Sequence, residues 1–160
     1  PFFMIDLPIP KKDSNITIID CFNEYVKSED MTGDNAWYNE KTKQKQDVKK
    51  QLIFWSLPNI MVLTLKRFTN TNKKDNTNVE FPLNNLDLSS YIKGYSAKSY
   101  VYDLYGICNH LGGPLGGHYT AFVKNANDKW YHFNDTNVSE VNNPNSMIGS
   151  QAYCFFYRKR

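Results

Sequence analysis

Two runs of aromatic and β-branched residues flank a short polar break in the last third of the chain. Residues 119–123 (YTAFV) and 130–133 (WYHF) have the composition that is typical of strands. The break between them contains Asn-Ala-Asn-Asp at residues 125–128, and these residue types tolerate turn conformations. The pattern predicts a β-hairpin, and its register decides what His118 faces.

The length of the hairpin loop selects the neighbour of His118. A hairpin centred on Ala126 puts Asn134 opposite His118, and a loop longer by one residue puts Asp135 there instead. Directly opposed residues have Cβ atoms about 4.5–5.5 Å apart. Either side chain could therefore accept a hydrogen bond from the imidazole, fixing its tautomer and leaving the other ring nitrogen free to move a proton. The alternative is an ordinary histidine at the start of a strand.

Four of the six residues at 112–117, directly before His118, are glycine. Glycine allows positive φ angles and lets another chain approach the backbone closely. We expect this glycine lip (residues 112–117) to suit an extended peptide substrate with small residues at the reacting bond. The alternative is a flexible loop ahead of the strand.

A helix is expected near the start of the chain, because apolar residues recur at helical spacing over residues 18–26. Thr17 is the expected N-cap, and Asp20 places a carboxylate in the first turn.

The remaining apolar runs predict strands, and the polar stretches between them predict loops. Strands are expected at residues 3–7, 35–38, 52–57, 60–68, 100–108 and 152–157. Residues 39–50 are expected to form an exposed β-ribbon, 69–79 a mobile surface loop, 86–92 a short amphipathic or bridging segment, and 142–149 a loop. Several strands with one early helix predict a single α+β domain with a mainly antiparallel sheet.

Composition narrows the function classes. Hydrophobic residues make up 41% and aromatic residues 15% of the chain, which argues against disorder, and a net charge of +3 is too small to indicate a nucleic-acid-binding protein. No apolar run approaches the ~20 residues of a membrane span, and the first residues do not resemble a signal peptide. The three cysteines form no C-x-x-C pair. We therefore expect an intracellular protein, cytoplasmic or nuclear, without metal or cofactor and without nucleic-acid or membrane partners.

Several stretches of the chain form a specific combination. The most distinctive is GGHYTAFVKN followed by WYHFND; the others are TGDNAWY at residues 32–38, Leu57-Pro58, VLTLKRF at 62–68 and SQAYCFFYRKR at the end. Together they resemble the ubiquitin-specific proteases, which are papain-like cysteine peptidases. The resemblance extends over nearly the whole chain and follows the order of the second half of that catalytic domain. The resemblance implies a mainly antiparallel palm with a finger-like ribbon at residues 39–50 and few helices.

The same resemblance assigns roles to particular residues. It makes His118 the general base, prefers Asn134 as the residue that orients it, and makes Asp135 a supporting neighbour. It also implies that the loops at 69–79 and 110–117 flank a channel for the ubiquitin tail. Gly116, Gly117 and Tyr119 would lie along this channel, and Phe81 would line its apolar part.

The chain departs from the family pattern in two places. The family's nucleophilic cysteine belongs to an N-terminal box that is absent here, and Cys21, Cys108 and Cys154 do not fit that role. Many members also carry C-x-x-C after the Trp-Tyr pair, as half of a zinc ribbon. Residues 39–42 of this chain are Asn-Glu-Lys-Thr, which cannot supply thiolates to zinc.

Two functions are therefore in competition. In the first, an upstream half of the catalytic domain supplies the thiol, and the complete protein cleaves the (iso)peptide bond after the C-terminal glycine of ubiquitin. The second is a non-catalytic ubiquitin-binding module that lacks the nucleophile. Without the upstream half a large apolar face would meet water, so we expect the isolated chain to fold poorly.

Overall fold

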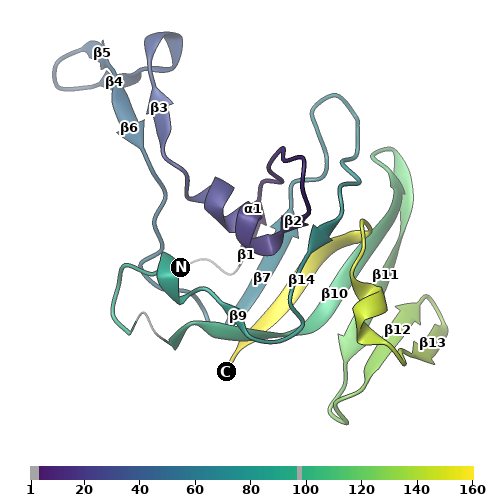
Figure 1. The fold of residues 1–160 in the computed structure, drawn as a ribbon. Helices are drawn as coiled ribbons and strands as arrows, with labels where there is room; N and C mark the ends of the chain where they lie inside the picture. Colours follow the sequence, from purple (N-terminus) through teal and green to yellow (C-terminus); the bar gives the residue numbers. More distant parts are fainter. Residues whose placement is uncertain (1–3, 97–98) are drawn as a thin grey trace.

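A single eight-stranded sheet forms the body of the computed structural model, which describes residues 4–96 and 99–160. Its strand order is β1-β7-β14-β10-β11-β12-β13, with β9 paired to β10 (Figure 1). The strands are β1 (Met4–Leu7), β7 (Ile60–Leu65), β9 (Leu86–Asp87), β10 (Val101–Gly113), β11 (Gly116–Lys124), β12 (Trp130–Asn134), β13 (Asn137–Glu140) and β14 (Ala152–Lys159). Only β1 and β7 pair in parallel within this sheet. The predicted mainly antiparallel α+β fold is confirmed; Phe3, placed in the first strand by the sequence, lies outside the described residues.

One α-helix, α1 (Ile18–Tyr25), covers part of the sheet beside β1 (Figure 1). Thr17 caps it as predicted: the Thr17 hydroxyl oxygen accepts from the backbone N–H of Asp20 at 3.2 Å, and the Asp20 carboxylate accepts from the backbone N–H of Thr17 at 2.9 Å. The hydrogen bond that the Asp20 carboxylate accepts from the Thr17 backbone, with a second from the Thr17 hydroxyl at 2.9 Å, holds the pKa of Asp20 below its usual value. Each residue thus satisfies a backbone donor that the first helical turn leaves free.

The core lies between α1 and the centre of the sheet, where the side chains are almost completely inaccessible to solvent. The sheet contributes Leu7, Leu63, Leu65, Tyr102, Phe155 and Tyr157, and α1 contributes Ile18, Cys21 and Phe22. The two buried tyrosines keep hydrogen-bond partners, because Tyr102 donates to the carbonyl of Pro58 at 2.9 Å and Tyr157 to that of Pro82 at 2.7 Å. Both bonds tether the loops that frame the sheet.

A narrow ribbon, here called the finger (residues 29–50), projects from the body beside α1 (Figure 1). It consists of β3 (Glu29–Met31) paired with β6 (Val48–Lys50) and β4 (Trp37–Asn39) paired with β5 (Gln44–Gln46), with a 3-10 turn at Gly33–Asn35. The exposed ribbon predicted for residues 39–50 is therefore present, and it begins ten residues earlier than expected.

One predicted strand is absent. Within residues 52–57 only Phe54 makes a ladder contact, an isolated bridge to Ile92, while Leu52, Ile53 and Trp55 are exposed. The neighbouring strand β7 is already paired with β1 on one side and β14 on the other. β7 therefore offers no open edge to the run that precedes it, and the prediction of a strand at 52–57 was wrong.

The glycine lip deviates in the opposite direction, because most of the expected loop is strand. β10 continues to Gly113 and β11 begins at Gly116, so only Pro114 and Leu115 lie outside the strands. Gly112 makes this geometry possible with φ +103, where a Cβ would lie 2.7 Å from the carbonyl oxygen of Gly116. The expected 110–117 loop is therefore the tip of a long hairpin.

The remaining elements of the described chain are short. A parallel pair joins β2 (Ile16–Thr17) to β8 (Val79–Glu80), and 3-10 turns occupy Ser89–Tyr91 and Pro144–Met147. Among the helices in the described part of the chain, none has the length and apolar character needed to cross a membrane.

Candidate active site

The side chains of His118 and Asn134 meet at one end of the sheet. His118 lies on β11 and Asn134 is the last residue of β12, and the Nε2 atom of His118 is 2.6 Å from the Oδ1 atom of Asn134. Because an amide oxygen can only accept, this bond requires the proton on Nε2. In the neutral ring this leaves the lone pair on Nδ1, which can then accept a proton.

The hairpin register differs from both alternatives considered from the sequence. Ala121 pairs with Phe133 and Val123 with Tyr131, which centres the hairpin on Asn127. His118 and Asn134 consequently meet diagonally, two positions away from direct opposition. Diagonal neighbours on one face of a sheet remain within reach of long side chains, which explains the contact despite the wrong register.

Asp135 is a more distant neighbour of the same imidazole. Its Oδ2 atom is 3.9 Å from Nε2 of His118, beyond hydrogen-bond distance, and its side chain is 76% exposed. The backbone of Asp135 has φ 50, which turns the chain directly after Asn134. Asn134 is therefore the hydrogen-bond partner of the His118 imidazole, and Asp135 is a solvated charge nearby.

Gly116, Gly117 and Tyr119 share a groove of about 460 Å³ between the glycine lip and the 69–79 loop. A Cβ on Gly117 would overlap the carbonyl oxygen of Leu111 and the imidazole of His110, so this position has no room for a side chain. We call this hollow the tail groove; it is lined by Phe68, Thr69, Asn72, His110, Gly113, Pro114, Leu115, Gly116, Gly117 and Tyr119.

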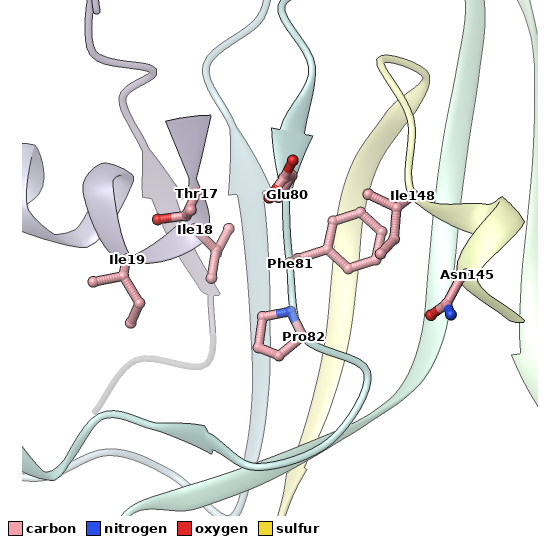
Figure 2. A pocket seen from close by; sticks show the side chains of 8 residues that line it. All are labelled: Thr17, Ile18, Ile19, Glu80, Phe81, Pro82, Asn145 and Ile148. Atoms are coloured by element: carbon pink, nitrogen blue, oxygen red, sulfur yellow. The ribbon is translucent and has the colours of Figure 1, made fainter. Parts of the chain in front are cut away.

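Phe81 does not line the tail groove. Its side chain is 3% exposed and packs on Phe155 with ring centroids 4.7 Å apart. It borders a separate apolar cleft of about 630 Å³, where residues of α1, β8 and the 144–147 turn face one another (Figure 2). The lining residues of this cleft are Thr17, Ile18, Ile19, Glu80, Phe81, Pro82, Asn145 and Ile148.

The three cysteines, all within the described residues, are free thiols held in unreactive surroundings. Burial raises the pKa of Cys21 to about 12 and that of Cys154 to about 11, and it also raises the pKa of Cys108. Cys108 lies inside the sheet between Ala121 and Cys154. A nucleophile must be available as the thiolate, so the environment of these cysteines opposes that role.

The described residues contain no cluster of three or more His, Cys, Asp or Glu side chains able to hold a metal ion.

At the tip of the finger, hydrogen bonds of the Asn39 side chain organise the turn. Its Oδ1 atom accepts from the backbone N–H of Lys41 at 3.0 Å and of Thr42 at 3.4 Å, and its Nδ2 atom donates to Gln46 at 3.0 Å.

Sequence reasoning missed two residues that shape the tail groove. Arg67 is completely buried, and its guanidinium donates to the carbonyls of Ala152, Asp75 and Thr77 at 2.8–3.0 Å. These bonds fix the base of the 69–79 loop and end β7 before the predicted Phe68. His110 is 4% exposed and lies under the glycine lip. A basic residue ending an apolar strand was the available signal for Arg67; the burial of His110 had no comparable signal.

The chain is similar to known proteins along almost its whole length. The profile of the family described as ubiquitin carboxyl-terminal hydrolase matches residues 12–157. Ubiquitin carboxyl-terminal hydrolase 10 of Arabidopsis thaliana is 39% identical over 170 residues, covering 98% of this chain and 18% of the relative. Ubiquitin carboxyl-terminal hydrolase 12 of Saccharomyces cerevisiae is 40% identical over 154 residues, covering 93% of this chain and 12% of the relative.

Solved structures show the same fold. A SAGA DUB module containing Ubp8, bound to monoubiquitin, matches with a TM-score of 0.79 and 32% identity over 99% of this chain and 35% of that chain. A yeast SAGA DUB module matches with a TM-score of 0.78 and 32% identity, covering 97% of this chain and 35% of that chain. The present chain thus spans about a third of the solved chains and less than a fifth of the curated relatives. Its fold is that of a fragment of their catalytic domain, and the chain belongs to the ubiquitin carboxyl-terminal hydrolase family.

Proposed function

We propose that the complete protein is a cysteine-type deubiquitinating peptidase that cleaves the (iso)peptide bond after the C-terminal glycine of ubiquitin. In this proposal the described chain supplies the general base, His118, and the amide that orients it, Asn134. The observation that carries the proposal is the 2.6 Å contact between Nε2 of His118 and Oδ1 of Asn134, one residue beyond the glycine lip.

The reaction needs a thiol from residues outside this chain. The Nδ1 atom of His118 takes the thiol proton, and the thiolate attacks the carbonyl carbon of the scissile bond. The same imidazole then gives the proton to the departing amine, which leaves an acyl-enzyme. Water attacks this intermediate as His118 accepts its proton, releasing the ubiquitin carboxylate and restoring the thiol. General acid–base transfer of this kind contributes roughly 10²–10⁴-fold to the rate.

The shape of the tail groove supports ubiquitin as the substrate. Gly113, Gly116 and Gly117 line this groove with backbone alone, so an extended tail that ends in Gly-Gly can approach it closely. The solved relatives include SAGA DUB modules bound to monoubiquitin and to ubiquitin aldehyde. We assign the ubiquitin tail to the groove between the glycine lip and the 69–79 loop.

We further propose that an upstream half of the catalytic domain packs against this chain and brings the nucleophile. The apolar cleft around Phe81 and Ile148 offers a surface for that packing (Figure 2). The length of the relatives supports this proposal, because the chain spans only about a third of the solved chains. The three free thiols suit a reducing compartment, so we assign the protein to the cytoplasm or nucleus.

The experiment uses the full-length protein and a ubiquitin that carries a fluorogenic group at its C-terminus. His118→Ala should reduce kcat by at least about 100-fold while ubiquitin affinity changes little, because only proton transfer is removed. His132→Ala is the matched control, since that histidine packs on Phe122 away from the glycine lip. Turnover by His118→Ala at the rate of the unmodified protein would disprove the assignment.

A non-catalytic ubiquitin-binding module is the second candidate, favoured by the burial that raises the pKa of all three cysteines. A ubiquitin with an electrophilic C-terminus separates the two functions. The peptidase becomes covalently labelled at a cysteine outside this chain. The module binds the probe reversibly, without a covalent adduct.

A further inference from the structure

His110 occupies an unusual position between the two sides of the tail groove. Its backbone belongs to β10, where it pairs with Tyr119 of β11, and its ring lies 4.8 Å from the Tyr119 ring. On the other side the imidazole contacts the ring of Phe68 at 5.2 Å and that of Tyr153 at 6.5 Å. Aromatic rings from three separate strands or loops therefore enclose one histidine.

The same imidazole supports the glycine lip from below. It lies so close to the Cα atom of Gly117 that an added Cβ there would overlap Nε2. The backbone of His110 also contacts the opposite wall of the groove, the 69–79 loop, because its carbonyl accepts a hydrogen bond from the Nζ atom of Lys74 at 2.5 Å. Lys74 pairs in turn with Phe68 across the 69–79 loop. His110 thus connects both walls of the groove.

The polar character of the ring distinguishes it from a simple core residue. Nδ1 of His110 is buried and has no hydrogen-bond partner among the described residues. Burial, with a smaller contribution from Lys74, lowers the pKa of His110, so the ring is neutral at physiological pH. A buried polar atom without a partner costs free energy, which the packing against the surrounding rings offsets.

We propose that His110 is a positioning residue that fixes the width of the tail groove, by holding the backbone of Gly117 against the base of the 69–79 loop. The inference rests on the proposed function, because it assumes that the ubiquitin tail lies in this groove. His110 acts on substrate binding and not on proton transfer, since Asn134 holds the His118 ring independently.

The first test measures binding by calorimetry, with the full-length protein carrying His118→Ala to prevent turnover. Its affinity for intact ubiquitin is compared with that for ubiquitin lacking the C-terminal Gly-Gly. Adding His110→Ala should weaken binding of intact ubiquitin roughly tenfold, because the tail must then order a backbone segment that the imidazole had fixed. Binding of the truncated ubiquitin should stay unchanged.

Steady-state kinetics in the otherwise unmodified full-length protein give the second readout. His110→Ala should raise KM for the fluorogenic ubiquitin substrate about tenfold and change kcat less than threefold, since a lost tail contact affects binding. His110→Gln, whose amide reaches the position of Nε2, should recover most of this loss. His132→Ala serves again as the control histidine and should leave both KM and the preference for intact ubiquitin unaltered.

The outcomes separate the inference from the function on which it rests. A folded His110→Ala variant that keeps the full preference for intact ubiquitin overturns the role of His110, as does an equal loss of affinity for both ubiquitins. Failure of the parent protein to bind ubiquitin, or to distinguish the two forms, overturns the proposed function itself. If His110→Ala does not fold, His110→Val decides, because its short side chain does not extend to the Gly117 backbone: a preference for intact ubiquitin below that of the parent supports the role, and an unchanged preference together with unchanged KM contradicts it.

Discussion

The finger and the candidate site lie at opposite ends of the molecule and are organised differently (Figure 1). In the finger, short antiparallel pairs with mostly exposed side chains are closed by local bonds, such as those of Asn39 to Lys41 and Thr42. At the site, His118 and Asn134 are 16 residues apart and meet across two neighbouring strands of the main sheet, β11 and β12. The fold of the finger therefore depends on local hydrogen bonds in its turns, whereas the geometry of the site depends on the register of strands in a large sheet.

The largest expected effect is a loss of kcat when the hydrogen bond between His118 and Asn134 is removed. Asn134→Ala in the full-length protein removes the acceptor for Nε2 of His118, and the imidazole can then adopt the unproductive tautomer and orientation. We expect kcat to fall roughly 100-fold or more. Asp135→Ala should cost less than tenfold, because Asp135 is 3.9 Å from Nε2 and largely exposed. Equal losses in a ubiquitin hydrolysis assay would show that the geometry has selected the wrong orienting residue.

A smaller effect is expected from replacing Arg67, whose buried guanidinium connects segments that are distant in the chain. Arg67→Met keeps the apolar stem but leaves the carbonyls of Ala152, Asp75 and Thr77 without their buried donor. The free energy of unfolding should fall by about 3 kcal/mol, since each unsatisfied buried group costs about 1–3 kcal/mol.

Urea denaturation of the full-length protein measures this change. Arg158→Met is the matched control, because Arg158 is exposed and only lies over the Tyr105 ring at 5.9 Å. A loss no larger than that of the control would contradict the anchoring role of Arg67.

The smallest effect concerns the finger alone. Asn39→Ala removes the side-chain bonds to Lys41, Thr42 and Gln46, so local opening of β4 and β5 should become easier by about 1 kcal/mol. Hydrogen exchange of the finger amides should accelerate while the unfolding midpoint of the body stays constant.

Two controls sharpen this result. Glu40→Ala removes only an exposed ion pair with Lys43 and should have almost no effect. A chelator should leave the exchange rates of the finger unchanged, because Asn39 and Thr42 provide no thiolates for zinc. A chelator-sensitive finger would contradict the metal-free arrangement.

Local patterns predicted most of the elements correctly. The α1 cap at Thr17 and Asp20, the strand at 60–65, the last strand and the hairpin at residues 119–133 all follow from residue spacing and turn composition. The errors arose where a neighbour decided the outcome. The 52–57 run could not pair with β7, because β1 and β14 occupy both edges of that strand, and the glycine lip extends the β10–β11 ladder.

Residue spacing and turn chemistry act over a few residues, so they were enough to predict the helix cap, most of the strands and the residues from which a base and its orienting group could be chosen. The folded chain was needed to show that Asn134 and not Asp135 meets Nε2 of His118, that Arg67 anchors the 69–79 loop and that His110 lies beneath Gly117. These contacts depend on sheet register and burial, and residues far apart in the chain set both.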